Sequence, residues 1–132
     1  MTAPSMLAGA KAMAVLRAED LGRARSFYAD TLGLEVEDAP DGSEFRAMAG
    51  DGTAFSVYVR PGMPAPQNTT LGFMVDDIAA AMADLRSRGI VFQEYDMPEI
   101  GLKTVDGVAT MGDTKVAWFE DSEGNILMLG TM

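Results

Sequence analysis

The chain has 132 residues, which suits one domain with a substantial core, and it carries a formal net charge of −10. It contains neither cysteine nor histidine, which excludes disulfides, thiolate metal sites and thiol nucleophiles and removes the commonest metal ligand and general base. The negative charge disfavours nucleic acid and anionic membranes, and it either serves solubility alone or weakly attracts a cationic small molecule.

The first half of the chain predicts a strand, a helix and three further strands. In chain order these are a strand at 12–18, a helix at 21–32 and strands at 34–38, 43–49 and 53–59. Asp20 can cap the helix and Gly33 can end it. The turn signals APDG and GDG separate the strands.

The second half repeats this order. Its predicted elements are a strand at 69–75, a helix at 78–88 and strands at 90–95, 114–120 and 125–130. Asp76 or Asp77 can cap the helix, and Gly89 can end it. The repeat indicates a single domain over residues 1–132, with module one at about 12–60 and module two at about 69–131.

The two modules differ in length. Asp20 and Asp77 lie 57 residues apart, whereas the segments DGTAFSV and EGNILML match at a spacing of 72. This difference predicts an insertion in module two, an apolar loop at about 96–113 that folds over a pocket as a lid or packs on a second subunit.

Alternate residues of a strand point to opposite faces, so the inner strands can be divided by parity. One parity is large and apolar and predicts the face that the helices cover: Leu16, Phe55, Val57, Val59, Leu71, Phe73, Val75, Leu127 and Leu129. The other parity mixes polar, small and flexible side chains: Met13, Val15, Arg17, Ser56, Tyr58, Thr70, Gly72, Met74, Ile126 and Met128. This mixture favours the ligand-binding wall of a concave pocket. The alternative is that these residues pack against one another across the two sheets.

Three segments, RAEDLGRARSFYADTLGLEV, GFMVDDIAAAMADLRSRGI and VAWFEDSEGNILML, carry a resemblance to a known family. Together with the paired modules they resemble the vicinal oxygen chelate superfamily, which includes glyoxalase I, extradiol dioxygenases and bleomycin resistance proteins. The resemblance covers about residues 12–131. It implies an α+β fold in which two βαβββ modules pair mixed sheets around a concave pocket.

The resemblance also implies where a metal would be held. Its metalloenzymes place ligands on the first and last strands of each module, which here fall on Met13, Ser56, Thr70 and Met128. Thioethers and hydroxyls are weak donors for a divalent cation, so we expect no bound metal and no cofactor. The segment EDSEGN lacks the spacing of a calcium loop and predicts a hairpin turn.

Two functional hypotheses follow. One is metal-free binding of an apolar or cationic small molecule, in the manner of bleomycin resistance proteins; methionine-rich walls suit irregular ligands. The other is a lyase, isomerase or dioxygenase-type enzyme of the same superfamily without the usual metal ligands. Its candidate groups show no visible pairing of base with nucleophile: Arg17, Tyr58, Glu94, Tyr95, Glu99, Lys115 and Glu120.

The expected setting is the cytoplasm. No apolar run approaches the roughly 20 residues of a membrane span, and the chain start lacks the pattern of a secretion signal. We expect a small-molecule ligand, no nucleic-acid or membrane partner, and a homodimer, which the resemblance implies.

Overall fold

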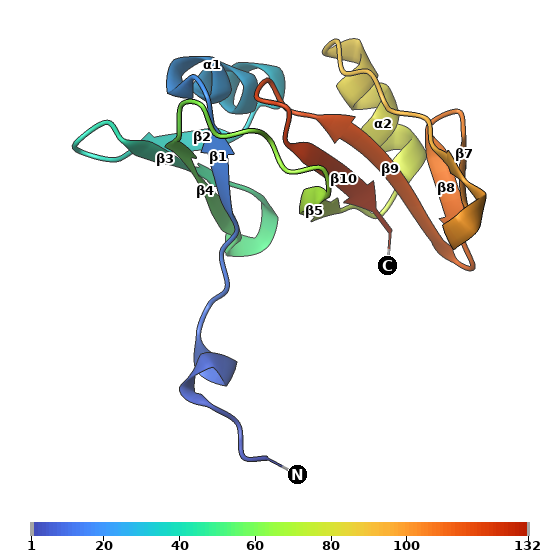
Figure 1. Cartoon of the computed structure of the whole chain (residues 1–132), viewed down its shortest axis with the longest axis horizontal. Coiled ribbons are helices and arrows are strands. Elements are labelled where there is room, and N and C mark those ends of the chain that lie inside the picture. The colour runs from blue at the N-terminus through green and yellow to red at the C-terminus, as the bar shows by residue number, and fades with distance from the viewer. Residues whose placement is uncertain (1, 132) are drawn as a thin grey trace.

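A computed structural model describes residues 2–131 and contains two mixed sheets with two α-helices on one side of them (Figure 1). Module one contains β1 (Val15–Ala18), α1 (Leu21–Ser26), β2 (Glu35–Asp38), β3 (Glu44–Met48) and β4 (Ala54–Val59). Its sheet has the order β1-β4-β3-β2, with β1 parallel to β4 and the other pairs antiparallel. A π turn (Phe27–Thr31) continues α1, and a 3-10 turn (Gly50–Gly52) precedes β4.

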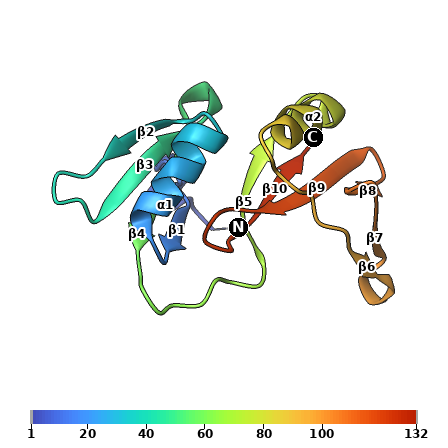
Figure 2. The ribbon, with the colours of Figure 1, turned by 90° about the horizontal axis from the view of Figure 1, so that it is seen from above.

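Module two repeats this plan and lies beside module one (Figure 2). It contains β5 (Thr69–Met74), α2 (Ile78–Ser87), β6 (Asp96–Met97), β7 (Leu102–Val105), β8 (Val108–Met111), β9 (Thr114–Glu120) and β10 (Ile126–Gly130). Its sheet has the order β5-β10-β9-β8-β7-β6, and β5 is parallel to β10 as β1 is to β4. By position in the sheet, β8 corresponds to β2, and β7 and β6 are additions at the outer edge.

Two predictions for module two are wrong. Residues 90–95 form no strand; the Gln93 N–H donates to the Trp118 carbonyl oxygen at 2.8 Å, and the Tyr95 carbonyl oxygen accepts the Thr104 N–H at 2.9 Å. The expected loop at 96–113 contains β6, β7 and β8. The β7–β8 hairpin forms because Asp106 and Gly107 both take positive φ, 52° and 82°, as a two-residue hairpin turn requires.

Both helices begin as the sequence predicts, and Gly33 and Gly89, with φ of 69° and 90°, follow the π turn after α1 and the end of α2. The Asp20 carboxylate accepts the Arg23 N–H at 3.0 Å. Asp77, rather than Asp76, caps α2 by accepting the Ala80 N–H at 3.0 Å. These bonds satisfy backbone donors that a helix start would leave free.

The core lies on the helix-facing side of both sheets, as the parity of the strands predicts, except that Val59 lies outside the core and lines a cavity with Val15 and Tyr58. Leu16, Phe55 and Leu127 are at most 2% exposed. The core is continuous between the modules, since the rings of Phe55 and Phe73 meet edge to face at 6.0 Å. The two modules therefore share one core, and their opposite faces are left for other contacts.

The segment before β1 extends away from the body of the fold (Figure 1). It contains a 3-10 turn (Met6–Gly9), whose Met6 and Leu7 are 95% and 80% exposed. We call residues 2–12 the N-terminal arm. Among the described residues, no helix is long and apolar enough to cross a membrane.

Candidate functional site

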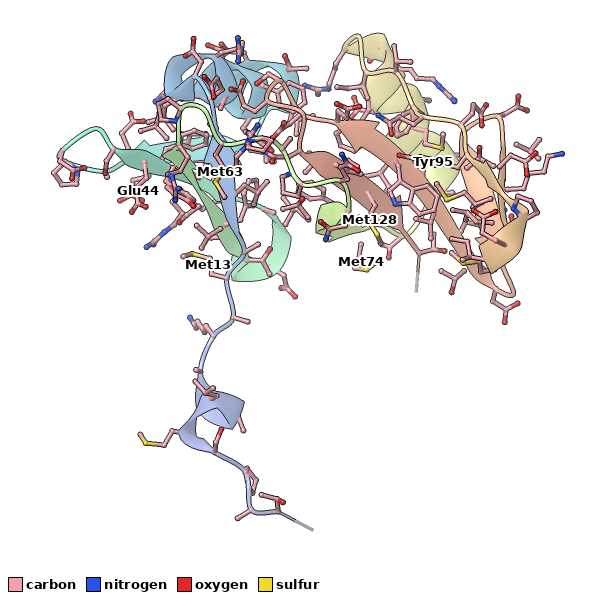
Figure 3. All side chains as sticks on the ribbon, in the orientation of Figure 1. Met13, Glu44, Met63, Met74, Tyr95 and Met128 are labelled. Carbon is pink, nitrogen blue, oxygen red and sulfur yellow. The ribbon has the colours of Figure 1, made fainter. Side chains whose placement is uncertain are left out.

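The faces of the two sheets that point away from the helices are open. Met13, Val15 and Met74 are 44%, 55% and 53% exposed. Figure 3 shows Met13, Met74 and Met128 on the side away from α1 and α2. These residues do not close against one another across the sheets, so the packing alternative does not describe them. We call this surface, which includes Val15, Ser56, Tyr58, Gly72, Met74, Trp118 and Met128, the open face.

In module one the open face combines small, aromatic and charged side chains. Val15 on β1 lies opposite Ser56 on β4, and Ser56 lies opposite Arg46 on β3. The Ser56 hydroxyl donates to the Met13 sulfur at 3.6 Å. Two cavities lie here. One, of about 440 Å³, is lined by Val15, Ser43, Glu44, Tyr58 and Val59, and the other, of about 220 Å³, is lined by Glu37, Asp38, Ala39, Pro40, Glu44, Phe45, Arg46 and Ser56.

In module two Met128 is the central side chain of the open face. It lies opposite Gly72 on β5 and Trp118 on β9. A Cβ at Gly72 would lie 3.1 Å from the Met128 Cγ, and a Cβ at Gly130 would lie 3.1 Å from its Cε. The Met128 side chain therefore fills the space beside Gly72, and it can move because methionine is flexible.

A further cavity of about 590 Å³ lies between the modules, beside β4 and β5. Its lining includes Gly72 and Met74 from the open face, and it is completed by Ala49, Gly50, Asp51, Thr53, Ala54, Phe55, Leu71, Phe73 and Asp76. It is the largest of the cavities described on either module.

An aromatic and polar cluster beside Met128 was missed by the sequence reasoning. The rings of Tyr95 and Trp118 meet edge to face at 5.4 Å. The Tyr95 hydroxyl donates to Gln93, whose amide donates to the Glu120 carboxylate. Burial, and then the charge of Glu120, raise the pKa of Tyr95, so its phenol stays protonated at neutral pH. The alternation of strand 114–120, with Phe119 inward, could have placed Trp118 on the open face.

The predicted ligand-binding residues do not all line the same cavity. Val15 and Tyr58 line one cavity, Ser56 lines another, and Gly72 and Met74 line the third. Met13, Thr70, Ile126 and Met128 lie on the strand faces around them and do not line these three cavities. The structure brings the residues to one side of the sheets without collecting them in a single pocket.

Arg17 is placed differently from the other nine. It is only 8% exposed, and its Nη2 donates to the Glu123 carbonyl oxygen at 2.9 Å. Its Nε and Nη1 are buried without a hydrogen-bond partner among the described residues. Arg17 thus holds the β9–β10 turn against β1 rather than lining the open face.

A buried polar network joins the modules at this turn. The Tyr28 hydroxyl donates to the Asp121 carboxylate at 2.6 Å, and the Asn125 amide donates to Asp121 and to the Arg17 carbonyl oxygen, each at 2.8 Å. Asp121 also accepts the N–H groups of Glu123 and Asn125. Burial, and then Asp121, raise the pKa of Tyr28. The predicted hairpin turn in EDSEGN is confirmed, and it also links the two modules; we call these residues the junction network.

The four positions at which the resemblance implies metal ligands, Met13, Ser56, Thr70 and Met128, do not fit a divalent cation. Ser56 is bonded to the Met13 thioether, and the Thr70 hydroxyl donates to the Asn68 carbonyl oxygen at 3.2 Å. Met128 packs over Gly72. None of the four supplies a carboxylate or imidazole. Over residues 2–131, moreover, no three aspartate or glutamate side chains gather where they could hold a metal ion.

The candidate groups for metal-free catalysis are only partly brought together. Tyr95 and Glu120 are joined through Gln93. Glu94 instead accepts from the Thr104 hydroxyl and the Gly107 N–H, and these bonds lower its pKa. The remaining candidates lie elsewhere: Arg17 in the junction network, Tyr58 in module one, Glu99 in the 3-10 turn after β6 and Lys115 on the helix-facing side of β9.

Residues 12–129 match the sequence profile of the Glyoxalase/Bleomycin resistance protein/Dioxygenase superfamily. A solved glyoxalase/dioxygenase from Nostoc punctiforme is 17% identical, with 99% of this chain and 95% of that chain covered and a TM-score of 0.68. A glyoxalase family protein from Bacillus anthracis is 17% identical, with 92% and 95% covered and a TM-score of 0.66. Lactoylglutathione lyase from Agrobacterium tumefaciens is 19% identical, with 92% of each chain covered and a TM-score of 0.62. No curated protein matches the sequence.

The fold and the profile define a paired-module α+β protein of the glyoxalase type. The chain belongs to the Glyoxalase/Bleomycin resistance protein/Dioxygenase superfamily, the vicinal oxygen chelate superfamily. At these low identities the solved structures establish the fold alone, so function has to be argued from the open face.

Proposed function

We propose that this protein binds a small apolar or cationic molecule on its open face without a metal ion. The observation that carries the proposal is the kind of side chain at the four positions where the resemblance implies metal ligands. Thioethers stand at Met13 and Met128, and hydroxyls stand at Ser56 and Thr70. An apolar or aromatic ligand is favoured by thioethers, whereas a chelated substrate needs a cation that this donor set does not hold.

The surroundings of these positions support a cationic or aromatic ligand. Trp118 and Tyr95 offer ring faces and edges on module two. On module one Glu44 lines both cavities and places a carboxylate beside the Tyr58 ring. The chain's charge of −10 adds a long-range attraction for cations.

A metal-dependent lyase or dioxygenase reaction is the other function that the superfamily offers. Both reactions need a metal that the Met13, Ser56, Thr70 and Met128 donors do not hold. Tyr95 and Glu120 are the groups through which a metal-free reaction would act, and Tyr95 is held protonated. Ligand binding is therefore the function that the site supports best.

Tetraphenylphosphonium and tetraphenylborate, which share a shape and differ in the sign of their charge, test the proposal. Trp118 is the chain's single tryptophan and reports on the open face. We expect tetraphenylphosphonium to change Trp118 fluorescence saturably in the presence of EDTA. Tetraphenylborate should bind this face at least about tenfold more weakly, because the surrounding carboxylates repel it.

Matched variants locate the binding. Glu120→Gln, which removes the carboxylate joined through Gln93 to the Tyr95 and Trp118 pair, should weaken tetraphenylphosphonium binding by a few fold, whereas Glu99→Gln, which removes a carboxylate from the outer edge of module two, should not. A fluorescence response that does not saturate, or equal affinity for the two ions, would show that the open face is not a site for cationic aromatic molecules.

We also propose that the protein is a homodimer. Met13 and Val15 are exposed on the open face, and Met6 and Leu7 are exposed on the N-terminal arm. Apolar surface of this kind on a small protein is typical of an interface. Light scattering should give twice the 14.0 kDa mass of one chain. The mass of a single chain across the whole concentration range would refute the dimer.

A further inference from the structure

A separate cavity lies on the helix-facing side of module two, away from the open face. It has a volume of about 470 Å³ and lies between α2 and the β7–β8 hairpin. We call it the edge cavity. Its lining is formed by Ile78, Ala79, Met82, Arg86, Lys103, Val105, Asp106, Val108, Thr110 and Lys115.

The edge cavity exists because module two has a wider sheet than module one. The sheet of module one has four strands under α1, whereas the sheet of module two has six strands under the single helix α2. Ile78 and Met82 of α2 are 6% and 2% exposed and pack into the core. The outer strands β7 and β8 extend beyond this contact, and Val105 on β7 is 66% exposed.

Strand register places two lysines and a hydroxyl on the cavity side of the sheet. Val105 lies opposite Val108, and Thr110 lies opposite Lys115. Because side chains alternate along a strand, Lys103 shares a face with Val105, and Thr110 shares a face with Val108. The polar residues Lys103, Thr110 and Lys115 therefore lie beside the apolar pair Val105 and Val108.

The positive charge in the edge cavity is not neutralised by ion pairs. Lys103 and Lys115 are two of the three lysines in the chain. The ion pairs formed by residues 2–131 involve Arg23, Arg25 and Arg88, and none of them involves a cation of this cavity. Arg86 donates to the carbonyl oxygen of Asp106 at 3.1 Å and stacks on Phe92, which leaves its charge without a carboxylate partner within 4.0 Å.

Three carboxylates lie near enough to offset this charge. Asp106 is the one acidic residue of the lining, Asp96 lies opposite Lys103 in the β6–β7 pair, and Glu94 has its pKa lowered by its hydrogen bonds and in part by the charge of Arg86. The lining itself holds three cations, Arg86, Lys103 and Lys115, against one carboxylate, and Asp96 and Glu94 do not line the cavity. The repulsion from distant carboxylates is screened over about 8 Å at physiological salt, so the local charges dominate there.

We infer that the edge cavity binds a small carboxylate that carries an apolar chain. The ammonium groups and the Thr110 hydroxyl suit the carboxylate. Ile78, Met82 and the two valines form an apolar wall for the chain. The volume lies within the range of about 300–1,000 Å³ that is typical of small-molecule sites. This inference is independent of ligand binding on the open face.

Octanoate is the probe that tests the inference, by titration of the ¹⁵N-labelled full chain followed by NMR. We expect saturable shifts of the amide signals of residues 78–86 and 102–117, without shifts of the Trp118 indole N–H or of the β5 amides. Octan-1-ol and inorganic phosphate should each bind at least about tenfold more weakly, because each lacks one of the two parts that the cavity recognises.

Variants distinguish octanoate binding in the edge cavity from non-specific attraction of octanoate to lysine side chains. The double variant Lys103→Gln/Lys115→Gln should bind octanoate about tenfold more weakly, whereas Lys11→Gln, which removes the lysine of the N-terminal arm, should bind like the parent. Unchanged binding in the double variant would overturn the inference. So would octanoate shifts centred on the open face, or phosphate binding as tightly as octanoate.

Discussion

Asp121→Ala is expected to lower the free energy of unfolding by about 3–5 kcal/mol, because it removes the acceptor at the centre of the junction network. The Asp121 carboxylate accepts from the Tyr28 hydroxyl, from the Asn125 side-chain amide and from two backbone N–H groups. The substitution leaves the Tyr28 hydroxyl and the two backbone N–H groups buried without this acceptor, and the Asn125 amide keeps only its bond to the Arg17 carbonyl oxygen; buried donors without a partner are costly. Urea unfolding at neutral pH measures the loss.

Two controls make this prediction specific. Asp113→Ala, in the exposed turn between β8 and β9, should change stability by less than about 0.5 kcal/mol. Tyr28→Phe removes one donor and should cost about 1–2 kcal/mol, well below the cost of losing the shared acceptor. If Asp121→Ala were as stable as Asp113→Ala, the turn would not hold the modules together in solution.

The second large effect concerns Glu123, whose side chain is fully buried beside Arg23. Burial alone would raise its pKa, but hydrogen bonds from Arg23, the Asp20 N–H and the Ser122 hydroxyl outweigh burial and lower the pKa to about 2. A carboxyl group whose folded pKa lies below its unfolded value of about 4.3 stabilises the fold above that value. This stabilisation, about 3 kcal/mol, is lost as the pH falls from about 4.3 to about 2.

Comparison with Glu123→Gln isolates this contribution. Hydrogen bonds also lower the pKa of Asp38, Asp41 and Glu94, so the acid sensitivity of the parent is not due to Glu123 alone. The parent should be more stable than the variant at pH 7, and this difference should shrink steadily and largely disappear near pH 2. A difference that stays constant over the pH range would contradict the low pKa of Glu123.

The core-facing half of the fold could be predicted from the sequence because strand alternation is local. Leu16, Phe55 and Leu127 belong to the predicted parity set and are buried. The caps Asp20 and Asp77 were likewise readable from residues within one helical turn. The buried strand faces and the helix caps could thus be predicted, because each depends on residues that are close together in the chain.

The edge of module two was misread because a local signal was overlooked. Residues 90–95 have the apolar content of a strand, but β8 pairs with residues 114–117 of β9, so that of the β9 backbone only the Trp118 carbonyl oxygen bonds to Gln93. The pair Asp106 and Gly107 between Val105 and Val108 is a hairpin signal that predicts β7 and β8. Reading that pair would have replaced the expected loop by a hairpin.

The junction network could not be predicted, because its partners are far apart in the chain. Tyr28 and Asp121 are separated by 93 positions, and Arg17 and Asn125 by 108. Nothing in EDSEGN distinguishes a solvated turn from one buried between modules. For the same reason Arg17 was assigned to the pocket by parity, although its side chain reaches the Glu123 carbonyl oxygen.

Met13, Ser56, Thr70 and Met128 stand where the resemblance implies a chelating set, and we propose that the open face binds its ligand without a metal. The metal content of tag-free protein, measured by elemental analysis after dialysis, tests that claim most directly. We expect zinc, iron, nickel and manganese all to be far below one equivalent per chain, because the four positions offer thioethers and hydroxyls only. Near-stoichiometric content of any one of these metals would contradict the account.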